Sequence, residues 1–139
     1  MQEQLWMDLA NGNQINRHQV YDSLPARMRM YSERVAYYVQ ILYHSALDMG
    51  IYENDAKLSR ERQPYVWESV KLFDIGYAAV PDFLKQKPSL TAEEHRIMER
   101  HTTDGFAIVL GNPVEEEFFS LSEEEKLIIS MGMDAAIGH

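Results

Sequence analysis

Apolar residues recur every three or four positions along residues 24–50, which is the spacing of one face of an α-helix. Ser23 is a suitable N-cap, Pro25 is tolerated in a first turn, and Gly50 favours a left-handed stop. The pattern predicts a long helix that buries this apolar stripe. The stripe consists of Met28, Tyr31, Val35, Tyr38, Val39, Leu42 and Ala46.

Shorter periodic stretches follow, separated by charged or helix-breaking residues. The charged stretch 54–63 has no period and predicts a loop, whereas apolar spacing predicts a helix over 64–73. Gly76 and Pro81 bracket a passage expected to be non-helical, and a helical turn is expected over 82–86. The middle of the chain is therefore predicted to consist of short elements.

Two capping-box patterns mark helix starts in the last third of the chain. Thr91 with Glu94 predicts the start of one helix that ends before Gly111. Ser122 with Glu125 predicts the start of the last helix, because a hydroxyl and a carboxylate at this spacing satisfy each other's backbone donors. The inward-facing residues of that last helix are expected to be Leu127, Ile128, Met131 and Ala135.

No segment shows the alternation of a strand, so the predicted fold class is all-α, a helical bundle of about five helices. The domain is expected to span 23–139, after a polar N-terminal segment over 1–22. A length of 139 residues with 45% hydrophobic and 25% charged residues fits one globular domain with one core.

Charge and cysteine content narrow the classes of function. The net charge of −9 argues against a broad electrostatic grip on DNA, RNA or an anionic membrane. The absence of cysteine excludes disulfides, thiolate metal sites and a cysteine nucleophile. The first sixteen residues lack the features of a signal peptide, and the most apolar stretch, 35–47, is too short to cross a bilayer. A cytoplasmic protein is therefore expected.

Three segments of the chain form a combined pattern. The order and spacing of the segments are more specific than the sequence of any one of them. Residues 31–35 are YSERV, residues 73–82 are FDIGYAAVPD followed by KPSLT at 87–91, and residues 98–101 are MERH followed by Gly105. Together they resemble the HD superfamily of metal-dependent phosphohydrolases, and specifically the HD-GYP branch associated with bacterial cyclic-di-GMP hydrolysis. This resemblance implies an HD-domain-like helical bundle.

The resemblance also implies a site in which histidine and carboxylate ligands hold two or three iron or manganese ions. In active members a metal-bound hydroxide attacks phosphorus, because the metals acidify water and stabilise the negative transition state. The family's opening-helix histidine corresponds to Tyr31, the histidine of its His-Asp pair to Phe73, and its phosphate-facing lysine to Tyr77. The metal-ligand positions that remain are Asp74, His101 and His139.

These losses predict a catalytically degenerate signalling or interaction domain with an incomplete metal site and no cofactor. Aromatic packing of Tyr31 and Phe73 is expected to fill the former metal site, with Tyr77 as a possible donor to Asp74. For His101 the competing interpretation is a hydrogen-bonded helical histidine, and for Asp74 it is a helix cap or a hydrogen bond to the backbone near Gly76. By resemblance, a homodimer or a protein partner is expected.

Two alternatives stay open. The first is a divergent metal-dependent phosphohydrolase that uses Asp74, His101 and residues beyond His139 with divalent iron or manganese; the chain ends within the family's next motif, which predicts a fragment of a longer domain. The second is a sensor that binds a cyclic dinucleotide through a local cationic pocket. The candidate cations for that pocket are Arg34, Lys71, Lys85 and Lys87.

Overall fold

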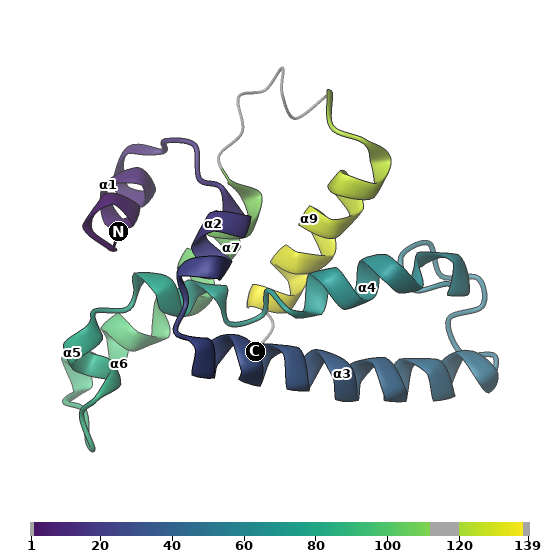
Figure 1. Cartoon of the computed structure of the whole chain (residues 1–139), viewed down its shortest axis with the longest axis horizontal. Helices are drawn as coiled ribbons and strands as arrows, with labels where there is room; N and C mark the ends of the chain where they lie inside the picture. Colours follow the sequence, from purple (N-terminus) through teal and green to yellow (C-terminus); the bar gives the residue numbers. More distant parts are fainter. Residues whose placement is uncertain (1, 112–119, 138–139) are drawn as a thin grey trace.

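The computed structural model describes residues 2–111 and 120–137, which are folded into helices joined by turns (Figure 1). Within these residues no strand occurs, so the predicted all-α class is confirmed. The elements are α1 (Gln2–Asn11), α2 (Arg17–Ser23), α3 (Ala26–Asp48), η1 (Arg60–Arg62), α4 (Gln63–Val70), η2 (Ile75–Ala79), α5 (Asp82–Lys85), α6 (Ala92–Glu99), α7 (His101–Leu110) and α9 (Glu123–Ile137).

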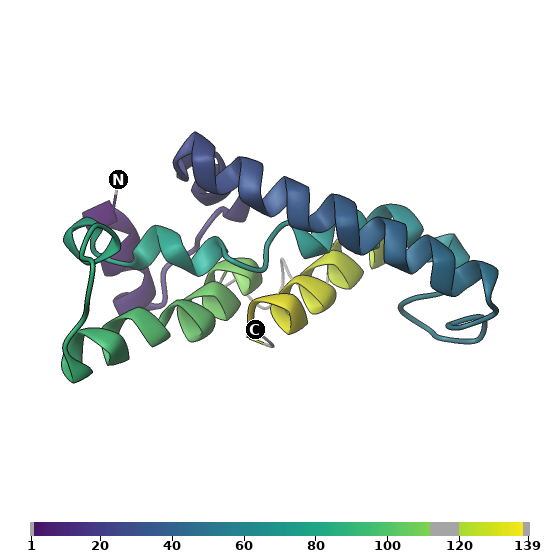
Figure 2. The ribbon, with the colours of Figure 1, turned by 90° about the horizontal axis from the view of Figure 1, so that it is seen from below.

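The main core lies where α7 meets α9 and η2, and α4 packs against the other side of α9. A second cluster lies between α3, α4 and α9 and is formed by Tyr43, Leu47, Val66 and Met131. Figure 2 shows α3 from below, extending along the outside of the other helices. The buried residues of the main core are Leu5, Val20, Leu72, Ile75, Ala79, Ile108, Val109 and Ala136.

The segment 1–22 contains two helices that the sequence pattern did not predict. Asn16 caps α2, since its side-chain oxygen accepts hydrogen bonds from the backbone N–H groups of His18 and Gln19 at 3.0 and 3.1 Å. Leu5 of α1 and Val20 of α2 belong to the main core. The division of the chain after residue 22 stays a prediction, but both helices of this segment contribute to the same core as the rest.

Polar side chains of α1 also hold the η2 turn. The Gln2 amide donates to the carbonyls of Ala78 and Val80 at 3.0 and 2.8 Å. The Trp6 indole N–H donates to the carbonyl of Ala79, between them, at 2.7 Å. Three consecutive carbonyls that η2 leaves without helical partners are thus satisfied by a distant helix.

The helix predicted to start at Thr91 is divided into α6 and α7. Its capping box is confirmed: the Thr91 hydroxyl accepts from the Glu94 N–H at 3.2 Å, and the Glu94 carboxylate accepts from the Thr91 N–H at 3.1 Å. The break falls near Arg100, where the hydroxyls of Thr102 and Thr103 bond back to carbonyls three residues earlier. The predicted stop is also confirmed, since Gly111 has a left-handed φ of 75°.

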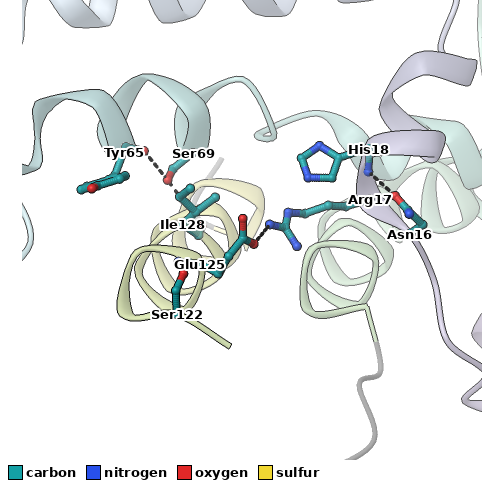
Figure 3. A network of polar contacts seen from close by, with 8 residues as sticks. All are labelled: Asn16, Arg17, His18, Tyr65, Ser69, Ser122, Glu125 and Ile128. Atoms are coloured by element: carbon teal, nitrogen blue, oxygen red, sulfur yellow. Dashed lines mark hydrogen bonds and ion pairs between the residues drawn. The ribbon is translucent and has the colours of Figure 1, made fainter. Parts of the chain in front are cut away.

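The last helix is fixed to α2 by an ion pair that Figure 3 shows together with its neighbours. The Ser122 hydroxyl accepts from the Glu125 N–H at 3.1 Å, as the capping box predicts. The Glu125 carboxylate reaches the Arg17 guanidinium at 2.5 Å. Beside it, the buried Ser69 hydroxyl of α4 donates to the Tyr65 carbonyl at 2.6 Å. Arg17 and Glu125 therefore connect elements that lie far apart in the sequence.

Two details predicted for the long helix are wrong. Ser23 is the last residue of α2, and its hydroxyl donates to the Val20 carbonyl at 2.6 Å instead of capping α3. No residue of the predicted stripe is fully buried: Tyr31, Tyr38 and Leu42 are exposed, and the other four are half-buried. The residues of α3 that are fully buried are Ser32, Ala36, Tyr43 and Leu47.

Candidate functional site

The three motif segments meet at one cleft of about 790 Å³. Its walls come from the start of α3, the residues that lead into and through η2, the short helix α5 and the end of α6. The predicted site residues Tyr31, Asp74 and Tyr77 all line it, so segments more than 40 residues apart in the sequence are adjacent in the fold. The remaining lining residues are Pro25, Arg27, Met28, Asp82, Lys85, Gln86 and Met98.

The cleft floor is positioned by a close approach of backbone to backbone. A Cβ at Gly76 would lie 1.7 Å from the His101 carbonyl oxygen and 2.7 Å from the Gly105 nitrogen. A Cβ at Gly105 would in turn lie 3.3 Å from the Gly76 nitrogen. Glycine at both motif positions therefore allows η2 to contact the first turn of α7, which sets His101 beside Tyr77.

Two aromatic pairs lie at the motif positions, and Tyr31 and Tyr77 line the cleft together with Asp74. The Tyr31 and Phe73 rings have centroids 6.1 Å apart, and the Tyr77 and His101 rings have centroids 4.6 Å apart at an interplanar angle of 32°. Tyr31 is 54% exposed, however, and Phe73 is half-buried. Tyr31 thus pairs with Phe73, and it also lines the open cleft. That aromatic packing fills the former metal site stays a prediction.

His101 is oriented by the backbone of the preceding helix. Its Nδ1 lies 2.7 Å from the Met98 carbonyl oxygen. Because a carbonyl only accepts, Nδ1 must donate, and the neutral ring then has its lone pair on Nε2. The interpretation of His101 as a hydrogen-bonded helical histidine fits this contact. The same arrangement is also common for histidines that bind metals, whose second nitrogen usually donates to a carbonyl or carboxylate.

The electrostatics of the cleft favour the neutral form of the Tyr77 phenol. Burial is the main cause that raises the pKa of Tyr77, and the negative charge of Asp74 raises it further. Outside the cleft, on the first turn of α7, burial raises the pKa of Asp104, against the opposing effect of Arg100. The Asp74 side chain makes no capping hydrogen bond at the start of η2, so the alternative role as a helix cap is not supported.

The expected ligands do not form a metal cluster within residues 2–111 and 120–137. No group of three or more histidine, aspartate or glutamate side chains gathers there closely enough to hold a metal ion. His139 lies outside the described residues. His44 and Asp48, an i, i+4 pair, contact other partners: His44 Nε2 is 2.6 Å from the Gln63 amide nitrogen, and Asp48 is 3.0 Å from Arg60.

The four candidate cations do not converge on one pocket. Lys85 lines the cleft and pairs with Asp82 at 3.3 Å, whereas Lys71 pairs with Glu68 elsewhere. The cleft has a second cation, Arg27, that the sequence analysis missed. The spacing of four residues between Arg27 and Tyr31 could have predicted that Arg27 lines the cleft, because residues at that spacing share a helix face. Of the remaining two, Lys87 pairs with Glu94 and Arg34 is exposed on α3.

Comparisons with protein-family models, with curated proteins and with solved structures find no match to this chain. The assignment to the HD-GYP branch stays a prediction that rests on the motifs.

Among the described helices, none is both long and apolar enough to cross a membrane.

Proposed function

We propose that this chain is a catalytically degenerate HD-GYP-like domain that acts in the cytoplasm as a signalling or interaction module. One observation carries the proposal: the positions of two histidines and a lysine in the family are occupied by Tyr31, Phe73 and Tyr77. Tyr31 and Tyr77 line the cleft with Asp74, and Phe73 pairs with Tyr31. A benzyl group cannot ligate a metal, and a phenol does so mainly as phenolate. The raised pKa of Tyr77 keeps that phenol protonated at neutral pH.

The remaining ligands are too few for the family's chemistry. A site for two or three divalent ions needs several anionic or imidazole ligands to neutralise and position the metals. Asp74 and His101 are the ligand positions kept among the described residues. Hydrogen bonds from groups behind the ligands orient them but cannot replace ligands that are missing. This scarcity supports a role in which the helical scaffold is retained for contacts with other molecules.

A divergent metal-dependent phosphohydrolase is the second candidate, and the orientation of His101 favours it. Because Nδ1 donates to the Met98 carbonyl, the lone pair of the neutral ring is on Nε2, which is then the nitrogen able to bind a metal. This enzyme would need further ligands from residues outside 2–111 and 120–137. Its metal would supply an activated water for attack on a phosphodiester.

Metal analysis and a hydrolysis assay separate these two functions. The purified protein is incubated with iron or manganese, desalted, analysed for bound metal, and assayed on cyclic dinucleotides. The first proposal predicts no stoichiometric metal and no turnover, and a change in stability alone for Asp74→Ala. Asp82→Ala is the control, because it removes another carboxylate from the same cleft. Stoichiometric metal with turnover that Asp74→Ala abolishes would establish the second candidate.

A further inference from the structure

The helix α3 has two apolar faces, and the large side chains of one are largely exposed, although Tyr31 near its start pairs with Phe73. The buried face, formed by Ser32, Ala36, Tyr43 and Leu47, packs on the body of the molecule. The large side chains on the opposite side are between 46% and 76% exposed. We call this side the outer face of α3; its members are Met30, Tyr31, Tyr37, Tyr38, Ile41, Leu42 and Met49.

The spacing along this side of α3 is that of a helix seam. One row alternates steps of four and three residues over about three heptads, which is the pattern by which two helices pack side by side. Such a row is expected to pair with another helix when it is exposed to water. Five residues of the row are exposed and Met28 and Val35 are half-buried. The row consists of Met28, Tyr31, Val35, Tyr38, Leu42, Ser45 and, directly after the end of α3, Met49.

The exposed area is large enough for a stable interface. The seven side chains of the outer face present on the order of 800–900 Å² of surface, compared with about 300–600 Å² for the largest apolar patch of a typical monomer. A stable interface buries about 800 Å² on each partner.

The charges along α3 select the orientation of a partner helix. Arg27 and Arg34 are exposed in its first half and form no ion pair with a described residue. Asp48 ends the helix, where it pairs with the exposed Arg60 at 3.0 Å, and Glu53 follows in the adjoining turn. A second α3 that runs antiparallel would bring Arg27 near the partner's Asp48, with the midpoint between Tyr37 and Tyr38. A parallel pair would instead place equal charges together at each end.

We propose that the outer face of α3 binds the same face of a second copy of this chain, antiparallel and related by a two-fold axis near Tyr38. The same surface on both subunits satisfies a closed two-fold dimer. This inference names the partner of the interaction module and rests on that proposed function. The two remain separable, because oligomeric state is measured without reference to metal or turnover.

Light scattering coupled to gel filtration tests the surface. The wild-type chain gives twice the chain mass of 16.2 kDa, and the double variant Tyr38→Glu with Leu42→Glu gives the monomer mass. Phe83→Glu is the matched control: Phe83 is 63% exposed on α5 and is not a residue of the outer face, so its variant stays dimeric. Circular dichroism verifies that each variant is folded.

Disulfide trapping tests the orientation, since the chain has no native cysteine. Arg27→Cys mixed with Asp48→Cys gives a mixed disulfide in the antiparallel dimer, whereas a parallel dimer gives Arg27→Cys homodisulfides. A wild-type chain that is monomeric at every concentration tested overturns the proposal and assigns the face to a different partner. A dimer that survives the double glutamate substitution, or homodisulfides in place of mixed ones, overturns it as well.

Discussion

Gly76 and Gly105 meet backbone to backbone, although 29 residues separate them in the sequence. A Cβ at Gly76 would lie 1.7 Å from the His101 carbonyl oxygen, a distance that real contacts do not allow. The contact joins the motif at 73–82 to the motif that begins at Met98. The position of Tyr77 relative to His101 therefore depends on the absence of a side chain at Gly76 and at Gly105. The glycines are therefore structural parts of the candidate site.

Replacement of Gly76 by alanine is expected to lower the free energy of unfolding by about 3 kcal/mol, because backbone must move on both sides. Gly105→Ala is expected to cost about 1 kcal/mol, since the new Cβ meets its neighbours at 3.3 Å. Urea unfolding measures both. Gly12→Ala is a control with positive φ but nothing within 4 Å, and it should cost about 1 kcal/mol. Equal effects of Gly76→Ala and Gly12→Ala would contradict this account.

The ionisation of Tyr77 should depend on Asp74. Burial and the Asp74 charge raise the folded-state pKa of Tyr77, so its contribution to stability is complete below pH 10 and decreases as the pH rises above 10. Asp74→Asn is expected to lower this pKa towards the usual value without reaching it, because the burial remains. The tyrosinate absorbance, corrected with Tyr77→Phe, reports it. Asp82→Asn, in the same cleft, should leave the Tyr77 titration unchanged.

The capping box of α6 should lose its effect in acid. The Lys87 ammonium, followed by the Thr91 N–H, lowers the pKa of Glu94 from 4.5 to about 2. The stabilisation is therefore present above pH 4.5 and is lost as the pH falls through about 2. In thermal unfolding over this interval, the melting temperature of Glu94→Gln should fall less than that of the wild type. Glu93→Gln should keep the wild-type slope, and a matching slope for Glu94→Gln would refute the assignment.

The ion pair between Arg17 and Glu125 should contribute more than an exposed pair. The Arg17 side chain is 13% exposed, so its charge is weakly screened. A double-mutant cycle with Arg17→Met and Glu125→Gln is expected to give a coupling of about 1.5 kcal/mol. Lys57 and Asp134, both largely exposed at 3.2 Å, provide the control cycle with about 0.3 kcal/mol. Equal couplings in chemical unfolding would show that burial of Arg17 has no effect.

Local features of the sequence predicted the elements that depend on local interactions. The Thr91–Glu94 box and the Gly111 stop depend on neighbours within four residues, so both could be predicted. The buried side of α3 could not, because the helix has apolar residues on two sides and its buried side includes Ser32 and Ala36. Periodicity alone favoured the stripe with the larger side chains.

The candidate site was predicted as far as motif spacing allowed. The convergence of Tyr31, Asp74 and Tyr77 followed from the resemblance, and the structure places these residues on one cleft. The openness of that cleft was not predictable, because it depends on how α3 lies on the other helices. The helices of residues 2–23 were missed for a similar reason, since Leu5 and Val20 are stabilised by contacts with distant residues.

The bonds from Gln2 and Trp6 to the carbonyls of residues 78–80 impose an order on folding. Their partners lie 73 to 78 residues later in the chain, so α1 emerges from the ribosome long before the turn that it holds. Such long-range closure slows folding, because chain entropy is lost before the contacts form. During synthesis the first helix therefore cannot form these contacts, and Leu5 stays exposed, until η2 has been translated.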